Sequence, residues 1–347
     1  MDKSLTIIIP TYNMEKYLRH CLDSLIVPNM DKVEVLVIND GSKDSSSAIA
    51  HEYQEKYPQT FRVIDKENGN YGSCINRGLK EATGKYVKVL DADDSFDKAG
   101  LRTFINILEN CNADLVLTDY VIVDEDDKVT SNFSYEEHDP SIPENVNFDF
   151  VKFINNEGVN FYGQMHGFAY RTQMLIDMGY HQTEGISYTD QEWVFKPITK
   201  VKSCLYNPKS VYRYLVGREG QTMNKLGKSI SQLIKVAFSM TEFYSSNTNK
   251  VKEYKKYLFS QLTTQIEYIY RLALYERAYP LSILQEFDKA LSKNSEVYSL
   301  VENAEWDRFP FHIKYIHYWR NHKQKGLPKI FILHKKFKQK VTSLFKA

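Results

Sequence analysis

The amino-acid sequence predicts an α/β fold, with a doubly wound, mostly parallel β-sheet followed by a helical C-terminal region. Two observations support this prediction. Short apolar runs alternate with helical patterns from Leu5 to about Ser134, which is the order expected of βαβ units. After Lys225 nearly all of the chain has helical periodicity. We therefore expect a first domain over residues 1–224, with halves 1–134 and 135–224, and a helical region over residues 225–347.

The individual elements follow from hydrophobic periodicity and from Gly, Pro, Asn and Asp punctuation. Strands are predicted at Leu5–Pro10, Val33–Ile38, Phe61–Asp65, Tyr86–Leu90, Asp114–Val123, Lys128–Phe133, Gly163–Arg171 and Leu205–Val216. Helices are predicted at Met14–Ile26, Ser45–Tyr57, Ser73–Ala82, Lys98–Asn110, Phe148–Ile154, Thr172–Met178 and Tyr188–Ile198.

Composition narrows the class of protein. The hydrophobic content of 42% and charged content of 26% are ordinary for a soluble globular protein. A net charge of +1 argues against a nucleic-acid partner. The 4 cysteines form no C-x-x-C pair, no apolar run is long enough to span a bilayer, and the first strand begins too early for a signal peptide. These features predict a cytoplasmic protein.

An acidic cluster, Asp91-Ala92-Asp93-Asp94, follows the apolar strand Tyr86–Leu90. Adjacent carboxylates repel one another and raise each other's pKa, unless a cation lies among them. Oxygen ligands suit Mg²⁺ or Mn²⁺, which commonly bind together with substrate phosphates. Ligands of open α/β sheets bind at the carboxyl ends of the strands, where this cluster lies. The alternative is a solvated turn that caps the helix beginning near Asp97.

Other polar residues are predicted at the same edge of the sheet. They are Tyr12, Asp40, the Asn68–Gly72 loop and Arg77. An aromatic ring can stack on a base, a carboxylate can accept from it, a glycine allows close approach, and an arginine can pair with phosphate. Taken singly, Tyr12 is also explained as a cover for the sheet edge, and Asp40 as part of a common turn.

Four segments in order and spacing resemble the family 2 glycosyltransferases, which have the Rossmann-like GT-A fold. They are IIIPTYN at Ile7–Asn13, VINDGSKDSS at Val37–Ser46, NRG at Asn76–Gly78 and VLDADD at Val89–Asp94. The resemblance covers roughly the first third of the chain. It implies that Pro10, Tyr12 and Asp40 contact the nucleoside of a donor. The other donor-site residues it implies are Asn68, Gly72, Arg77, Asp91, Ala92 and Asp93, with Asp91 and Asp93 as metal ligands and Asp93 nearest the Mn²⁺ or Mg²⁺.

The second half contains a further acidic segment, Tyr188–Trp193, which resembles the motif that carries the catalytic base in this family. We assign the base to Asp190, with Glu192 as second choice. The alternative for Asp190 is a charge that favours a helix N-terminus. The Tyr214–Thr222 segment resembles a loop that folds over the donor, so Arg218 is expected to reach the pyrophosphate. His166 is either an acceptor contact or a structural histidine.

The resemblance implies an inverting, metal-dependent transferase. It would move a hexose or N-acetylhexosamine from a nucleotide sugar, with UDP favoured, to a glycan or lipid-linked saccharide in cell-surface polysaccharide synthesis. A dinucleotide-dependent oxidoreductase requires G-x-G-x-x-G after the first strand, where this chain has PTYN. A nucleotidyltransferase would have a glycine-rich, basic first loop, which is also missing from the sequence. The remaining alternative is an inactive nucleotide-binding or scaffold protein that kept the fold.

The last part of the sequence is strongly basic. Lysines and arginines alternate with apolar and aromatic residues over Lys314–Lys346, and no Asp or Glu occurs from Phe309 onward. This pattern predicts an amphipathic element on an anionic membrane surface, and thus a peripheral enzyme at the inner face of the membrane. The alternative is that its apolar side packs on the catalytic body while the lysines face water.

Overall fold

The computed structural model describes residues 3–218, 230–302, 314–322 and 324–327. The chain divides into two compact units. One contains Met1–Gln221 and Asn247–Tyr257, and the other contains Thr222–Ser246 and Leu258–Ala347. The boundary expected between residues 224 and 225 lies outside the described residues, as does the basic segment beyond residue 327.

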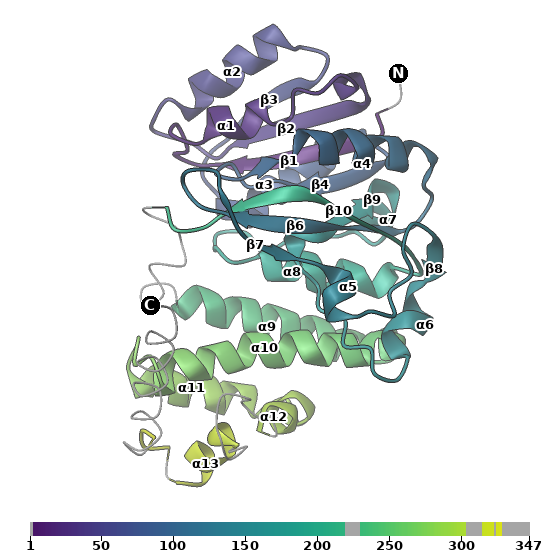
Figure 1. Ribbon diagram of the computed structural model, residues 1–347. Helices are drawn as coiled ribbons and strands as arrows, with labels where there is room; N and C mark the ends of the chain where they lie inside the picture. Colours follow the sequence, from purple (N-terminus) through teal and green to yellow (C-terminus); the bar gives the residue numbers. More distant parts are fainter. Residues whose placement is uncertain (1–2, 219–229, 303–313, 323, 328–347) are drawn as a thin grey trace, which may run out of the picture. The chain divides into compact units, whose positions relative to one another are not determined.

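The first unit is built on one sheet with the strand order β3-β2-β1-β4-β9-β6-β10-β5 (Figure 1). β1 pairs in parallel with β2 and β4, β2 with β3, and β6 with β10, whereas β9 runs antiparallel to both β4 and β6. The predicted α/β fold with a mostly parallel sheet is confirmed. The strands are β1 Leu5–Thr11, β2 Val33–Asn39, β3 Phe61–Asp65, β4 Tyr86–Val89, β5 Ser95–Phe96, β6 Leu115–Val123, β7 Val129–Phe133, β8 Asn147–Asp149, β9 Phe168–Arg171 and β10 Ser203–Leu215.

Helices cover both faces of the parallel strands, which explains why those strands are almost continuously apolar. Leu5, Ile7 and Ile9 of β1 pack in one cluster with residues of α1, α2 and α4. Gly78 of α3 lies against the Ile8 side chain. The helices of this unit are α1 Leu18–Asp23, α2 Ser46–Lys56, α3 Asn70–Glu81, α4 Lys98–Asn110, α5 Tyr135–His138, α6 Phe150–Asn155, α7 Thr172–Asp177 and α8 Asp190–Phe195.

The first helix is shorter than the sequence predicts, because it begins at Leu18 instead of Met14. The backbone N–H groups of residues 13–15 bind side chains of the loop after β2. Met14 N donates to Ser46 Oγ over 2.7 Å, and Glu15 N donates to Asp44 Oδ2 over 3.0 Å. A helix that began at Met14 would leave these N–H groups without intrahelical partners, so the tertiary hydrogen bonds satisfy them and fix the segment before Leu18.

The second unit is helical, as predicted. Its helices are α9 Ile230–Asn247, α10 Lys255–Leu274, α11 Leu281–Leu291, α12 Ser295–Glu302 and α13 Tyr315–Asn321. Asn247 of α9 and Lys255–Tyr257 of α10 belong to the first unit. No helix among the described residues is both long enough and apolar enough to cross a membrane.

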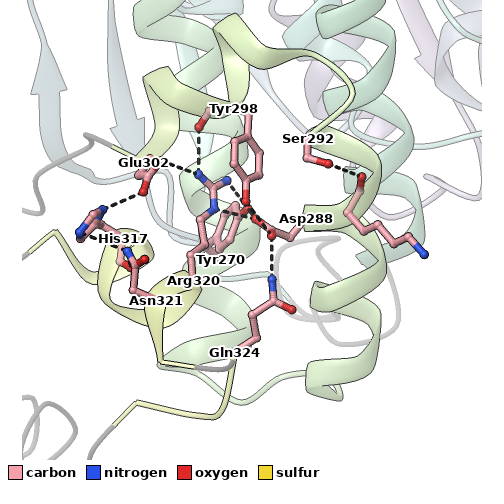
Figure 2. A network of polar contacts seen from close by, with 10 residues as sticks. Tyr270, Asp288, Ser292, Tyr298, Glu302, His317, Arg320, Asn321 and Gln324 are labelled. Carbon is pink, nitrogen blue, oxygen red and sulfur yellow. Dashed lines mark hydrogen bonds and ion pairs between the residues drawn. The ribbon is translucent and has the colours of Figure 1, made fainter.

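A buried carboxylate, Asp288 of α11, joins four segments of the helical unit (Figure 2). It accepts hydrogen bonds from Arg320 Nε over 2.8 Å, from Gln324 Nε2 over 2.9 Å and from Tyr298 over 3.3 Å, and it also binds the Tyr270 hydroxyl. The Arg320 guanidinium lies 3.4 Å from the centroid of the Tyr298 ring. This network fixes α13 against α10, α11 and α12.

The network corrects part of the prediction for the basic segment. In α13, the side chains of Tyr315, Ile316 and Trp319 are buried, and Arg320 is paired with Asp288. These residues were expected to face lipid from Lys314 onward, but they pack in the helical unit. The described part of the basic segment therefore packs within the helical unit itself, and its buried Trp319 and paired Arg320 do not face lipid.

We predict that Asp288→Ala destabilises the helical unit. The substitution removes the nearest carboxylate of the buried Arg320 and leaves only the longer 3.8 Å contact with Glu302 among the described residues, and breaking a buried pair from one side costs about 3–5 kcal/mol. Urea denaturation would measure the loss, and hydrogen exchange would locate it in α13. Glu286→Ala, an exposed change on the same helix, is the matched control and should alter stability by less than about 0.5 kcal/mol. Equal stability of the two variants would contradict the assignment.

Candidate active site

Three carboxylates, those of Asp91, Asp93 and Asp94, lie just after β4 with one oxygen each within 4.8 Å of one another. β4 is the last strand of the parallel group β3-β2-β1-β4, next to antiparallel β9, so the cluster lies at the carboxyl end of these parallel strands. This spacing and this set of hard oxygen donors suit a divalent cation such as Mg²⁺ or Mn²⁺.

Asp94 has a structural role within the cluster. Its side chain accepts from the Tyr212 hydroxyl over 2.5 Å and from the Leu215 amide over 2.7 Å, and the residue is 1% exposed. The same Tyr212 hydroxyl accepts from the Asp91 amide over 3.1 Å. Asp94 thus ties the end of β10 to the acidic loop. The sequence prediction left its role open.

Asp91 and Asp93 each have one partner that offsets their charge. The Tyr71 hydroxyl of α3 donates to Asp91 Oδ1 over 2.9 Å. Arg218 Nε lies 2.5 Å from Asp93 Oδ2, and the Arg218 guanidinium is 5.2 Å from the centroid of the Tyr17 ring. Arg218, predicted to reach a pyrophosphate, is therefore beside the predicted metal ligand Asp93.

The cluster is electrostatically strained. Burial, together with the negative charges of Asp93 and Asp190, raises the pKa of Asp91 to about 7, although the Tyr71 hydrogen bond and Arg218 oppose the rise. Burial, followed by the charges of Asp93 and Asp91, also raises the pKa of Asp94. A cation bound among these groups would relieve the repulsion.

Asp190 is the first residue of α8, directly after its N-cap Thr189. Its carboxylate accepts from Gln191 Nε2 over 3.1 Å, and burial raises its pKa. Its charge contributes to the raised pKa values of both Asp91 and Tyr71. The structure therefore brings Asp190, from the second half of the chain, within electrostatic range of the acidic cluster.

Glu192, the second candidate for a base, is fully buried. Its two oxygens accept from the amide and hydroxyl of Thr183, each over 2.7 Å, and Lys196 Nζ lies 3.0 Å away. These contacts make Glu192 an anchor for the Thr183 loop. They leave Asp190 as the better placed of the two carboxylates.

The residues expected around a nucleoside are near one another. Asp40 is 3% exposed, and its side chain pairs with Lys66 over 2.6 Å and accepts from the Gly69 amide over 2.9 Å. Asn68 donates to the Asp40 carbonyl over 2.9 Å. Tyr12 lies two residues after Pro10, and its ring is exposed. Asp40 therefore also shapes the loop beside it.

Of three other predicted donor residues, Gly72 and Ala92 are buried, and Arg77 is paired within its own helix. Gly72 lies in the first turn of α3, since this helix begins at Asn70 instead of Ser73, and a Cβ at Gly72 would be 2.0 Å from the Thr183 carbonyl oxygen. Ala92 packs in the apolar core. Arg77 pairs with Glu81 over 3.1 Å, one turn along the same helix. The structure does not bring the Arg77 guanidinium to the acidic cluster.

His166 lies in the 3₁₀ turn Met165–Gly167, where its ring packs against Tyr120, Tyr212 and Tyr214. Burial, followed by the charge of Lys88, lowers the pKa of His166 to about 3, so the imidazole is neutral. These contacts agree with the structural alternative for this residue.

Sequence reasoning missed two residues that support the site. Tyr71 holds Asp91, and its hydroxyl also lies 3.1 Å from Met165 Sδ. Lys88, fully buried in β4, donates to the His166 carbonyl over 2.6 Å and the Phe168 carbonyl over 3.3 Å. Burial lowers the pKa of Lys88 to about 7. The sequence signal that could have identified Lys88 is a lysine within an otherwise apolar strand.

Comparison with known proteins agrees with the fold. The family model described as Glycosyl transferase family 2 matches residues 6–178. Glycosyltransferase GlyA of Streptococcus pneumoniae is 29% identical over 62% of this chain, and this match spans 31% of GlyA. The EpsH protein of Bacillus subtilis is 25% identical over 74% of this chain and 73% of its own length.

A solved structure of Staphylococcus aureus TarS, residues 1–349 in complex with UDP, has the same fold. The TM-score is 0.58 with 21% sequence identity, and the likeness covers 91% of this chain and 87% of that one. Fold and site together define a glycosyltransferase of the GT-A type. The chain belongs to the family 2 glycosyltransferases.

The raised pKa of Asp91 predicts a particular pH dependence of stability in the metal-free protein. Between its ordinary pKa of 3.8 and about 7, the folded protein holds a proton on Asp91 that the unfolded chain has released. Stability therefore falls as pH rises through this range, by about 1.4 kcal/mol per pH unit. Asp91→Asn removes this contribution, which urea unfolding in the presence of a chelator would measure.

The control for this experiment is Asp177→Asn, an exposed carboxylate of α7. Its stability should follow that of the unmodified protein at every pH. If the Asp91→Asn and unmodified proteins give parallel curves between about pH 4 and 7, Asp91 does not carry the raised pKa.

Proposed function

We propose that the protein transfers a hexose or N-acetylhexosamine from a UDP-sugar to a glycan or lipid-linked saccharide, with inversion at the anomeric carbon. The observation that supports this proposal is the approach of Asp190 to the acidic cluster. In this proposal Asp190 acts as the base, and the carboxylates after β4 bind a cation beside a nucleotide. Synthesis of a cell-surface polysaccharide is the process that this activity would serve.

In this mechanism Asp190 takes the proton from an acceptor hydroxyl. Burial raises its pKa, which brings its basicity closer to neutral pH and makes it a better proton acceptor. The acceptor oxygen then attacks the anomeric carbon from the face opposite the nucleoside diphosphate. The bond between the sugar and the diphosphate breaks in the same step, which inverts the configuration.

The residues present fit a divalent cation. Asp91 and Asp93 would hold it, because Asp94 is committed to β10. A bound Mn²⁺ or Mg²⁺ supplies positive charge next to the departing diphosphate. Arg218, beside Asp93, is placed to pair with the same phosphates. Exposed Tyr12 and the Asp40 region would bind the nucleoside.

UDP is the first nucleotide to test, because solved structures of TarS with this fold are complexes with UDP and with UDP-GlcNAc. Pocket shape decides the sugar, so a panel of UDP-hexoses and UDP-N-acetylhexosamines is the suitable screen.

We also propose that the protein docks peripherally on an anionic membrane through the basic residues beyond residue 327. The residues that support this are Lys329, Lys335, Lys336, Lys338, Lys340 and Lys346, interspersed with Ile330, Phe331, Leu333, Phe337 and Phe345. Such a sequence combines attraction to anionic lipid with apolar side chains that insert at the interface. An acceptor carried on lipid at the inner leaflet would be within reach of a docked enzyme.

We predict that Asp190→Asn lowers turnover by roughly a hundredfold or more, because the amide keeps the shape but cannot accept the proton. The assay is UDP release from the donor panel, with Mn²⁺ or Mg²⁺ and with EDTA in a parallel series. UDP binding in the presence of Mn²⁺ should survive, since Asp190 acts on the acceptor.

Glu192→Gln is the comparison variant. It removes charge from a buried anchor, so it should lower the melting temperature before it affects chemistry. A mild effect of Asp190→Asn, together with a strong loss of turnover in a normally folded Glu192→Gln protein, would identify Glu192 as the base. Turnover that is unaffected by EDTA would exclude the metal.

For the membrane, we predict that the full-length protein sediments with vesicles rich in phosphatidylglycerol and is released as salt rises. Replacing Lys335, Lys336, Lys338 and Lys340 by Gln should abolish binding. Replacing four exposed lysines of the first unit, Lys16, Lys56, Lys80 and Lys98, is the charge-matched control. A protein that ignores anionic vesicles at low salt would refute membrane docking.

A further inference from the structure

Hydrogen bonds to the backbone of the loop between α7 and α8 hold this loop against α3 and the residue before it. Asn76 of α3 donates from Nδ2 to the Gln182 carbonyl over 2.9 Å and accepts at Oδ1 from the Gln182 amide over 2.8 Å. The Gly185 amide donates to the Gly69 carbonyl over 2.9 Å. The absence of a side chain at Gly72 lets Thr183 approach the helix. The Asn76 side chain thus pairs with both backbone groups of Gln182, as a neighbouring strand would.

The Gln182 side chain links the same loop to the start of α8 by hydrogen bonds. Its Nε2 donates to the Thr189 carbonyl over 2.6 Å and to Thr189 Oγ1 over 2.9 Å, and its Oε1 accepts from the Tyr180 hydroxyl over 3.2 Å. Gln182 and Thr189 are both fully buried. Both hydrogens of the Gln182 side-chain amide therefore donate to Thr189, the residue that precedes Asp190.

The turn held in this way has an unfavourable backbone conformation. Tyr188 has a φ of 66°, which is uncommon for a residue with a bulky side chain and costs on the order of 1–3 kcal/mol. Thr189 then turns the chain into α8, a helix of 6 residues that begins at Asp190. A strained turn before a short helix needs an external hydrogen-bond partner to keep one geometry, and Gln182 supplies it.

We propose that Gln182, itself held by Asn76, is a positioning residue that fixes Asp190 for proton transfer. The inference rests on the proposed function of Asp190 as the base. Gln182 acts through Thr189, so its loss would let the start of α8 move while the donor side of the site stays intact. A displacement of about 1 Å at a reacting group can lower a rate by roughly a hundredfold.

The test compares Gln182→Met with the matched control Gln173→Met. Methionine keeps the length of the side chain but removes both donors. Gln173 is exposed on α7, where its amide binds only Asp177 of its own helix. We expect Gln182→Met to lower kcat for UDP release by roughly tenfold to a hundredfold, with the KM for the UDP-sugar within about twofold of the unmodified value. Gln173→Met should leave both constants unchanged.

A double-mutant cycle with Asp190→Asn separates positioning from general destabilisation. If Gln182 acts through Asp190, adding Gln182→Met to Asp190→Asn should lower the residual rate no further. An equal fold-loss in both backgrounds, or an unchanged kcat for Gln182→Met, would overturn the inference while the assignment of Asp190 stands. Full activity of Asp190→Asn alone would instead overturn the proposed base, and the inference with it.

Thr189→Val provides a second route if Gln182→Met does not fold. Valine matches the shape of threonine and removes only the Oγ1 acceptor, so one donor of Gln182 loses its partner. We expect a several-fold loss of kcat that disappears in the Asp190→Asn background. An unchanged kcat in a folded Thr189→Val protein would count against the inference.

Discussion

Mutual repulsion among carboxylates at the end of β4 is the constraint on which the rest of the first unit depends. Asp91, Asp93 and Asp94 lie within 4.8 Å of one another and are mostly buried. Each receives a hydrogen bond from a different part of the chain, respectively from Tyr71 of α3, from Arg218 after β10, and from Tyr212 within β10. Segments remote in sequence are thereby drawn to one edge of the sheet, which is also where Asp190 arrives.

The parallel strands and most helices were predictable because local pattern and tertiary role agree in them. A strand covered on both faces is expected to be mostly apolar, and β1 and β2 are buried and largely apolar, with Glu34 of β2 hydrogen-bonded to Thr6 of β1. The acidic cluster was visible in the sequence as carboxylates directly after an apolar strand, and their mutual repulsion suggested a bound cation. Family resemblance contributed the donor class and the base that we propose.

The parts that could not be predicted depend on contacts between distant loops. The start of α1 is set by Ser46 and Asp44, which no periodicity within α1 reveals. The roles of Gln182 and Asn76 arise from a pairing between residues more than 100 positions apart. The lysine in β4 was visible in the sequence, but its carbonyl partners at residues 166 and 168 were not. The sequence of α13 is amphipathic, as expected, but its apolar side is buried within the helical unit.

Gly72 shows where this architecture has least freedom to change. The Thr183 carbonyl occupies the space that a side chain at position 72 would need, with only 2.0 Å available for a Cβ. The helix next to the donor-side loop and the loop that leads to Asp190 therefore meet backbone to backbone. Among natural variants of this sequence, the tightest restriction should fall on a residue without any functional group, where even one methyl group would force the two halves of the site apart.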